Sequence, residues 1–183
     1  MSVDPTRRGF LTGLVAAGTA AGLAGCGFQP VYMPTATGQQ GVVARQLAAV
    51  NVGIIPDRPG QLLRQALQVR LGNDSGVRQR YDLAVAFWIS GDGIGILPDN
   101  SVTRVRVTGH VNWALLSQDQ ARTRLTTGSA LALDGMNIFN QQYFALDLEN
   151  ETVQRRLAEN LADQVTTQLA IWFRQQAAAS GTG

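Results

Sequence analysis

The amino-acid sequence predicts an α+β fold, a two-layer sandwich in which two helices pack on one face of a roughly four-stranded mixed or antiparallel sheet. Three observations predict it. Apolar residues recur at helical spacing in two segments, they alternate at strand spacing in three others, and the elements follow the order β-α-β-β-β-α. Clean alternation is typical of a sheet that is covered on one face only.

The first two elements occupy residues 47–72. Residues 47–55 (LAAVNVGII) predict a strand. A helix is expected to follow, because Asp57 can cap free amide groups and Pro59 is tolerated in a first helical turn. Its apolar positions recur at helical spacing: Leu62, Leu63, Ala66, Leu67 and Leu71. Gly72 is predicted to end the helix.

Three strands are predicted next, over 81–89, 105–115 and 122–133, with a hairpin turn over 91–100. In the second strand the apolar residues share one face, and the other face carries Arg104, Arg106, Thr108, His110 and Asn112. In the third strand, alternation places Leu125, Leu131 and Leu133 opposite Arg122, Arg124 and Thr126. An irregular loop is expected over 134–149. Asn150 is then predicted to cap a final helix, which ends near residue 176 before a frayed tail. The apolar residues of this helix form one stripe: Val153, Leu157, Leu161, Val165, Leu169, Trp172 and Phe173.

The N-terminal segment resembles an export signal for a lipoprotein. Arg7 and Arg8 form a twin-arginine motif, a short apolar stretch follows, and residues 23–26 (LAGC) have the form of a lipobox. We therefore expect residues 1–25 to be removed and Cys26 to carry acyl chains. More than one chain is needed for stable anchoring to a membrane.

Residues 26–45 are expected to be a lipidated tether and 46–183 a single α+β domain. The tether contains Phe28 and Tyr32, for which two positions stay open: at the membrane interface, or folded back onto the domain. Without the signal, 13 basic and 12 acidic residues remain, and this balance gives no argument for a nucleic-acid partner. All basic side chains are arginine, which binds carboxylate or phosphate with two donors.

No catalytic constellation or metal site is predicted. The single cysteine is committed to lipid, so no thiolate ligand remains, and the sequence has no Gly-x-Ser-x-Gly motif. His110 is the only histidine and falls on a predicted open strand face, which favours a solvated or hydrogen-bonded side chain. We expect no cofactor other than the covalent lipid on Cys26.

Three stretches resemble the alphaproteobacterial branch of the lipopolysaccharide (LPS)-assembly lipoprotein family, LptE. They are residues 26–32 (CGFQPVY), residues 54–71 with the run DRPGQLLR, and residues 142–145 (QYFA) followed by a long helix that contains Arg155 and Arg156. The resemblance implies two helices on a small mixed sheet. It also implies a lipid-anchored protein on the periplasmic side of the outer membrane. Such a protein plugs the LptD-like β-barrel that inserts lipopolysaccharide, assists the assembly of that barrel and interacts with LPS.

Two groups of residues are candidate binding sites. Arg104, Arg106, Arg122 and Arg124 are candidates for the phosphates of LPS, although a solvated sheet face with charges that discourage edge pairing is the simpler explanation. Arg104 and Arg106 are expected to lie far from Arg122 and Arg124, as two basic spots. Phe139, Tyr143 and Phe144 are candidates for contact with a barrel wall, and the alternative is that they cover the domain's own core.

The sequence thus predicts a non-enzymatic outer-membrane lipoprotein in LPS assembly. One alternative is a lipoprotein accessory subunit of an envelope lipid transport system, which would need the same tether and a similar small domain. A second alternative is an exported periplasmic enzyme. Only the twin-arginine motif favours it, because that export route often carries cofactor-loaded proteins.

Overall fold

The computed structural model describes residues 41–73, 76–96, 102–137 and 143–181, which belong to one compact unit of the chain. Its elements are α2 (Val42–Ala48), β1 (Val50–Val52), α3 (Asp57–Leu71), β2 (Tyr81–Ile96), β3 (Val102–Ser117), β4 (Arg124–Asn137) and α4 (Tyr143–Ala179). The predicted α+β class is confirmed. The described residues contain a third helix, α2, that the sequence pattern does not predict.

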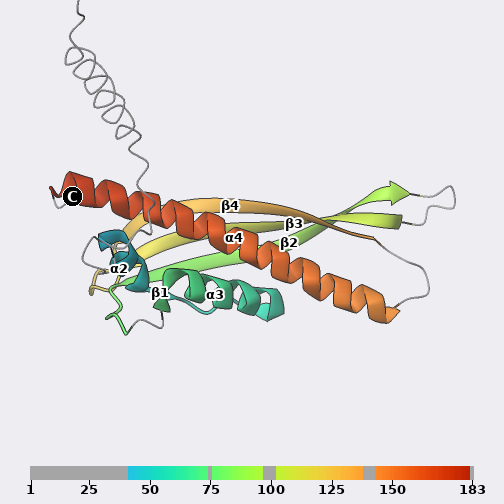
Figure 1. Cartoon of the computed structure of the whole chain (residues 1–183), viewed down its shortest axis with the longest axis horizontal. Coiled ribbons are helices and arrows are strands. Elements are labelled where there is room, and N and C mark those ends of the chain that lie inside the picture. Colours follow the sequence, from blue (N-terminus) through green and yellow to red (C-terminus); the bar gives the residue numbers. More distant parts are fainter. Residues whose placement is uncertain (1–40, 74–75, 97–101, 138–142, 182–183) are drawn as a thin grey trace, which may run out of the picture. The chain divides into compact units, whose positions relative to one another are not determined.

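The sheet has the strand order β1-β2-β3-β4. β1 pairs with β2 in parallel, and the other two pairs are antiparallel, so the sheet is mixed. α3 and α4 lie on the same side of the sheet (Figure 1), where α4 contacts β3 and β4 and α3 contacts β1. We call the helix-covered side the inner face and the opposite side the outer sheet face.

The hydrophobic core fills the space between the helices and the inner face. Its fully buried leucines come from both layers: Leu47, Leu63, Leu67, Leu71, Leu83, Leu115, Leu157, Leu161 and Leu169. Full burial of such a side chain contributes about 1.5–3 kcal/mol. α4 comes close to β3 at Gly109, where Leu161 Cδ1 lies 3.0 Å from the position that a Cβ would occupy.

α3 follows the prediction along its length but not at its N-terminal cap. The predicted apolar positions Leu62, Leu63, Leu67 and Leu71 are buried. Pro56 holds the cap position and no side chain caps the helix, so the cap predicted at Asp57 is wrong; Asp57 is instead the first helical residue, with a φ of 67°. The helix ends at Gly72, whose φ of 72° is a left-handed conformation that costs glycine little.

The segment before α3 differs from the prediction. The sequence predicts a tether through residue 45 and a strand over 47–55, whereas the structure has a helix over Val42–Ala48 and a strand only over Val50–Val52. Leu47 is buried, and α2 packs against α4. A short apolar run is compatible with a helix or with a strand. The packing of this segment against α4 therefore decides that it is a helix.

The β2–β3 hairpin is longer than predicted. The sequence predicts a turn over 91–100, but β2 continues to Ile96 and β3 begins at Val102. Glycines at 91, 93 and 95 obscure the strand alternation because they have no side chain. In the hairpin they make room for branched residues of β3, since a Cβ on Gly95 would lie 2.6 Å from Thr103 Oγ1.

The C-terminal helix is also longer than predicted. The loop predicted over 134–149 is wrong, because β4 continues to Asn137 and α4 begins at Tyr143. Asn150 lies inside the helix and is not its cap; its Oδ1 accepts a hydrogen bond from Gln154 Nε2 at 3.2 Å. Contrary to the predicted frayed tail, the helix continues to Ala179. The predicted stripe is confirmed for Val153, Leu157, Leu161, Val165, Leu169 and Phe173, which are buried, while Trp172 is half-buried.

The leucines of β4 lie on the face opposite to the one their pattern suggests. The sequence predicts them opposite the arginines, as core residues would be. In the structure Leu131 pairs with the outward-facing His110, and Leu133 lies on the same outer face. The buried positions of β4 are Ala130 and Ala132. Small residues are needed there because α4 packs closely over the inner face.

The prediction that Arg122 and Arg124 share a strand face is wrong. Arg122 lies in the turn before β4 with a φ of 46°, and β4 begins at Arg124. The register shifts between Leu115, which pairs with Thr126, and Leu116, which pairs with Arg124. This bulge reverses the alternation, so Arg124 lies on the same outer face as the leucines.

Candidate functional site

The outer sheet face is a broad surface that no helix covers in the described part of the chain (Figure 1). Cross-strand partners place their side chains on the same face of a sheet. The residues on this face are Ala84, Ala86, Trp88, Ser90 and Asp92 of β2, Arg104, Arg106, Thr108, His110, Asn112 and Ala114 of β3, and Arg124, Thr127, Ser129, Leu131 and Leu133 of β4. Three of the four sequence-predicted arginines, Arg104, Arg106 and Arg124, thus belong to one surface.

An apolar patch crosses the middle of the outer sheet face. It consists of Trp88, Leu131 and Leu133, which are 47%, 50% and 60% exposed, together with His110 between them. The Trp88 and His110 rings are stacked, with their centroids 5.1 Å apart and their planes at 6°. Contiguous exposed apolar side chains of this kind mark interaction surfaces more often than scattered ones do.

The surroundings of His110 do not make it a catalytic or metal-binding group. Its Nε2 lies 3.3 Å from Ser90 Oγ, and within the described residues no carboxylate hydrogen-bonds to the imidazole to orient it as a general base. The same residues contain no group of three or more potential metal ligands.

Exposed arginines flank the apolar patch at both ends of the sheet. Arg104 and Arg106 lie on one side, where β3 begins. Arg124 pairs with Leu116, which is ten residues beyond Arg106 on β3. At about 3.3 Å per residue, this separation is about 33 Å. The arginines therefore form two groups and cannot bind one small anion together.

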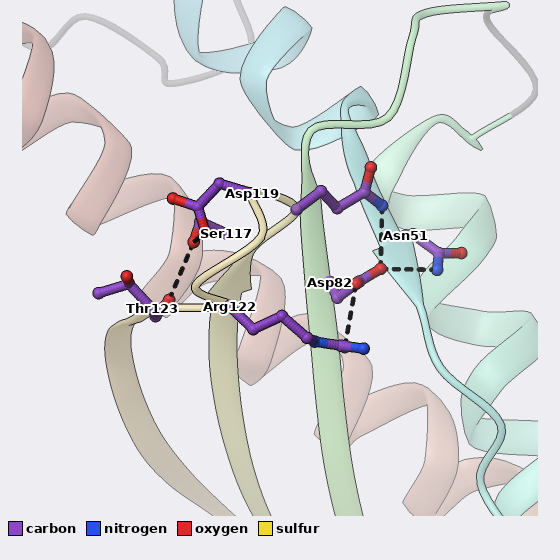
Figure 2. Close-up of polar contacts among 7 residues, drawn as sticks. Asn51, Asp82, Ser117, Asp119, Arg122 and Thr123 are labelled. Atoms are coloured by element: carbon purple, nitrogen blue, oxygen red, sulfur yellow. Dashed lines mark hydrogen bonds and ion pairs between the residues drawn. The ribbon is translucent and has the colours of Figure 1, made fainter.

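Arg122 differs from the other three because it is held by Asp82. Asp82 Oδ2 accepts a hydrogen bond from Arg122 Nη2 at 3.1 Å, and Asp82 Oδ1 accepts one each from Asn51 Nδ2 and Gln118 Nε2, both at 2.9 Å (Figure 2). These donors come from β1 and from the turn between β3 and β4. Asp82 therefore connects three segments that are distant in sequence.

The hydrogen bond from Asn51 is the main reason that the pKa of Asp82 lies below its ordinary value; the Gln118 hydrogen bond and the positive charge of Arg122 lower it further, against the opposing effect of burial. In the same turn the Ser117 hydroxyl donates to Asp119 at 2.7 Å and so lowers the pKa of Asp119 (Figure 2). Arg122 is thus committed to an internal carboxylate, whereas Arg104, Arg106 and Arg124 have no ion pair within the described residues.

Between the apolar patch and Arg124 the outer sheet face is a shallow trough of about 720 Å³. Its floor consists of small side chains, among them Ala84, Ala86, Ala114, Thr127 and Ser129. This floor lets another surface approach the sheet closely.

On the helix side of the domain, four arginines form ion pairs with carboxylates of the same molecule. Arg156 makes two hydrogen bonds to Asp134, at 2.7 and 3.2 Å, and ties α4 to β4. The other pairs are Arg70–Asp163, Arg58–Glu151 and Arg155–Glu151, of which the first two join α3 to α4. The side chain of Arg70 is the main reason that the pKa of Asp163 lies below its ordinary value.

The free edge of β4 is covered by polar side chains of α4. Gln164 Nε2 donates to the Leu131 carbonyl, and Gln168 Nε2 donates to the Ser129 carbonyl, both at 2.9 Å. Gln168 Oε1 also accepts the Trp113 indole N–H at 3.0 Å. These hydrogen bonds satisfy groups that would otherwise pair with a foreign strand.

Several predicted residues lie outside what the structure describes. Cys26 and Phe139 are not among the described residues, nor is most of the tether. Tyr143 and Phe144 lie in the first turn of α4 by their backbone, and their side chains are not described. None of the helices that are described has a stretch apolar and long enough to cross a bilayer.

Sequence reasoning missed the apolar part of the outer sheet face. Trp88 falls between the inward-facing positions of 81–89, which are the odd-numbered ones. This even-numbered position is the signal that could have placed Trp88 on the outer sheet face. Residues 130–133 read Ala-Leu-Ala-Leu. Hydrophobicity alone favours the leucines as the buried set, and the pattern contains no signal of how closely a helix packs on the strand.

The fold and this surface define a class of protein: a small two-layer α+β domain whose charged and aromatic side chains gather on an open sheet face. The family model LptE, described as lipopolysaccharide-assembly, matches residues 47–169, and the chain belongs to this family. The resemblance noted in the sequence is thereby confirmed. Membership assigns the chain a role in LPS assembly, within a family of non-enzymatic envelope lipoproteins.

Solved structures of other proteins have a similar fold. A protein of Caulobacter crescentus CB15 described as a lipoprotein superposes with a TM-score of 0.58 and 21% identity, over 72% of this chain and 96% of that chain. Lipoprotein B of Nitrosomonas europaea gives a TM-score of 0.50 and 11% identity, over 73% and 83%. At these identities the likeness shows the fold alone. No curated protein matches the chain in sequence.

Proposed function

We propose that the chain is a lipid-anchored protein on the periplasmic face of the outer membrane. In this proposal it plugs the LptD-like β-barrel that inserts LPS and assists the assembly of that barrel. The observation that carries the proposal is the LptE family match over residues 47–169, which spans most of the described domain. The confirmed arrangement of helices on one face of a mixed sheet supports it.

The proposed anchor is the acyl group on Cys26, exposed after residues 1–25 are removed. The chain from Cys26 to Gly41, where the described domain begins, has 15 residue-to-residue steps and spans at most about 54 Å. An anchored domain is confined to a thin layer beside the bilayer. Its effective concentration near a barrel in the same membrane is therefore raised without any new contact.

The proposal includes LPS as a ligand. Arg104 and Arg106 are exposed on the same face of β3 and have no ion pair within the described residues. Guanidinium groups bind phosphate through two parallel hydrogen bonds. These two side chains are therefore the first candidates for contact with phosphates of LPS, and Arg122 is the weakest candidate because Asp82 holds it.

The test is to purify the tagged, acylated chain in mild detergent from separated outer and inner membranes. We expect it in the outer membrane fraction, together with one large β-barrel protein identified by mass spectrometry. The mass of the N-terminal peptide should show acyl chains on Cys26. A Cys26→Ser variant is the matched control and should be lost from the membrane fraction.

Two outcomes would contradict the proposal. Recovery from the inner membrane with transporter subunits would favour an accessory protein of an envelope lipid transport system. Recovery from the outer membrane in acylated form, but without a barrel, would exclude the plug.

A further inference from the structure

We propose that the outer sheet face, and not the helix side, is the surface with which this domain packs on its partner. The partner surface is the inner wall of the proposed barrel, and it presents an apolar strip flanked by carboxylates. The identity of the partner rests on the proposed function. The choice of face and the chemistry of the wall rest on the residues of this chain.

The first argument is the distribution of unpaired charge. On the helix side, four arginines are ion-paired with three carboxylates of the same molecule: Arg58 and Arg155 with Glu151, Arg70 with Asp163, and Arg156 with Asp134. On the outer sheet face, Arg104, Arg106 and Arg124 have no ion pair within the described residues. Asp92 lies opposite Arg106 in the β2–β3 register but forms no ion pair with it. The face is therefore net basic and is complementary to a surface that carries carboxylates.

The second argument is the continuity of the apolar patch. Trp88, His110 and Leu131 are consecutive cross-strand neighbours, and Leu133 adjoins them on β4. The exposed large apolar residues on the helices and next to them come from several elements: Val42 of α2, Ile54 before α3, Val69 of α3, and Leu148 and Ile171 of α4. Single exposed residues are ordinary, whereas a contiguous patch with an aromatic centre is typical of an interface.

The third argument concerns the mode of contact. A partner could in principle add a strand to the free edge of β4, but Gln164 and Gln168 already occupy the edge carbonyls of Leu131 and Ser129. Glu149 likewise accepts the backbone N–H of Asn137 at 3.3 Å. The outer sheet face has no such cover, and its trough of small residues accepts a close flat surface. Packing face to face is therefore favoured over strand addition.

The fourth argument favours a protein wall over a lipid. Arg106 and Arg124 lie about 33 Å apart along the sheet, which exceeds the span of one glycolipid headgroup. A protein wall that runs along the strands can contact both groups of arginines and the apolar patch between them. The experiment below distinguishes a protein wall from LPS at the Arg104–Arg106 end.

The experiment is photocrosslinking in cells that make the full acylated chain with the barrel. A benzoylphenylalanine residue is placed at Asn112 or Ser129, exposed on the outer sheet face, and at Gln65 or Asn160, exposed on α3 and α4 as matched controls. We expect a crosslink to the barrel from the two sheet positions and none from the two helix positions. A crosslink to LPS alone from the sheet positions, or to the barrel mainly from the helix positions, would overturn the inference.

Substitutions provide a second measurement. Arg106→Glu and Leu131→Ser should each reduce the barrel captured with the tagged chain about fivefold or more. Arg155→Glu and Val69→Ser make the same chemical changes on the helix side and should leave capture within about twofold of the wild type. Equal melting temperatures of all four variants would show that folding is not the cause. Equal capture by all four would overturn the inference.

The failure of this inference and the failure of the proposed function are distinguishable. If the unsubstituted chain captures no barrel, the proposed function fails. If the unsubstituted chain captures the barrel but the sheet variants capture it equally well, only the choice of face fails.

Discussion

The indole of Trp88 lies flat against the imidazole of His110, with the ring centroids 5.1 Å apart and the planes at 6°. The two residues are direct partners in the β2–β3 register, and both face away from the helices. An aromatic stack on an open sheet face covers no core of its own domain. It therefore marks the centre of the surface that we assign to partner contact.

Trp88 should dominate the solvent-accessible fluorescence of the protein. Trp88 is 47% exposed, whereas Trp113 is 5% exposed and its indole N–H is bonded to Gln168. In the Trp88→Phe variant we expect a shift of emission to shorter wavelength and weaker quenching by acrylamide. Trp113→Phe, the control, should leave most of the acrylamide-sensitive signal. An unchanged quenching constant in Trp88→Phe would show that this surface is covered in solution.

Gly128 should tolerate no side chain. A Cβ at this position would lie 2.5 Å from Trp113 Cζ2 and 2.7 Å from Gln168 Oε1. Gly128→Ala should therefore lower the free energy of unfolding by about 1–3 kcal/mol, measured by chemical denaturation.

The matched control for Gly128 is Gly135→Ala on the same strand. There the nearest atom to an added Cβ is the Val105 carbonyl oxygen at 3.6 Å, an ordinary contact. We expect its free energy of unfolding to change by less than about 0.5 kcal/mol. Equal losses for the two variants would mean that glycine is needed for another reason than the contact with Trp113.

Asp82 should make stability depend on pH in the acidic range. Its folded-state pKa is lowered, mainly by the hydrogen bond from Asn51. Its contribution is therefore fully present above the ordinary pKa of about 3.9 and is lost as the pH falls through the lowered value. Asp82→Asn should cost about 1–2 kcal/mol at pH 7, since the side chain is 22% exposed and accepts three hydrogen bonds.

The measurement is a series of urea unfolding curves for the wild type and Asp82→Asn between pH 7 and pH 2. The difference between the two free energies of unfolding should shrink below about pH 4. Asp92→Asn, an exposed position on the same strand with no ion pair in the described residues, should show no such difference. A gap for Asp82→Asn that stays constant to pH 2 would contradict the assignment.

The pair of hydrogen bonds between Arg156 and Asp134 should couple α4 to β4. Arg156 is 51% exposed and Asp134 22% exposed, so solvent screens the pair. A double-mutant cycle with Arg156→Gln and Asp134→Asn should give a coupling energy of about 0.5–1 kcal/mol that decreases at high salt. Additive effects of the two substitutions would show that the pair does not hold the helix to the strand.

Much of the fold is predictable because it depends on local periodicity. The leucines of α3 and the stripe of α4 recur every three or four residues, and large apolar residues recur at every second position over most of 81–89 and 105–115. The positions of Arg104 and Arg106 on the open face follow from the same alternation. The predicted ends of elements are wrong where the local sequence contains no periodic pattern, as at the glycines of the β2–β3 hairpin and at the start of α4.

The candidate site is only partly predictable, because the pairing register of neighbouring strands determines which of its residues lie side by side. Nothing near Arg122 in sequence indicates Asp82, which is 40 residues away. The bulge after Leu115 also places Arg124 on the same face as Leu131 and Leu133, and no residue type in the segment indicates such a bulge. Contacts of this kind depend on how strands align, which the periodicity of one strand does not contain.

By itself the sequence determined the class and order of the layers, because the spacing of apolar residues is a property of each segment alone. The tertiary structure decided that Leu131 and Leu133 face outward beside Trp88 while Ala130 and Ala132 face the core. The physical reason is steric. α4 comes so close at Gly109 that an added Cβ would lie 3.0 Å from Leu161, and Gly109 pairs with Ala132 of β4. Small side chains of β4 therefore face α4 there, and the leucines lie on the open face.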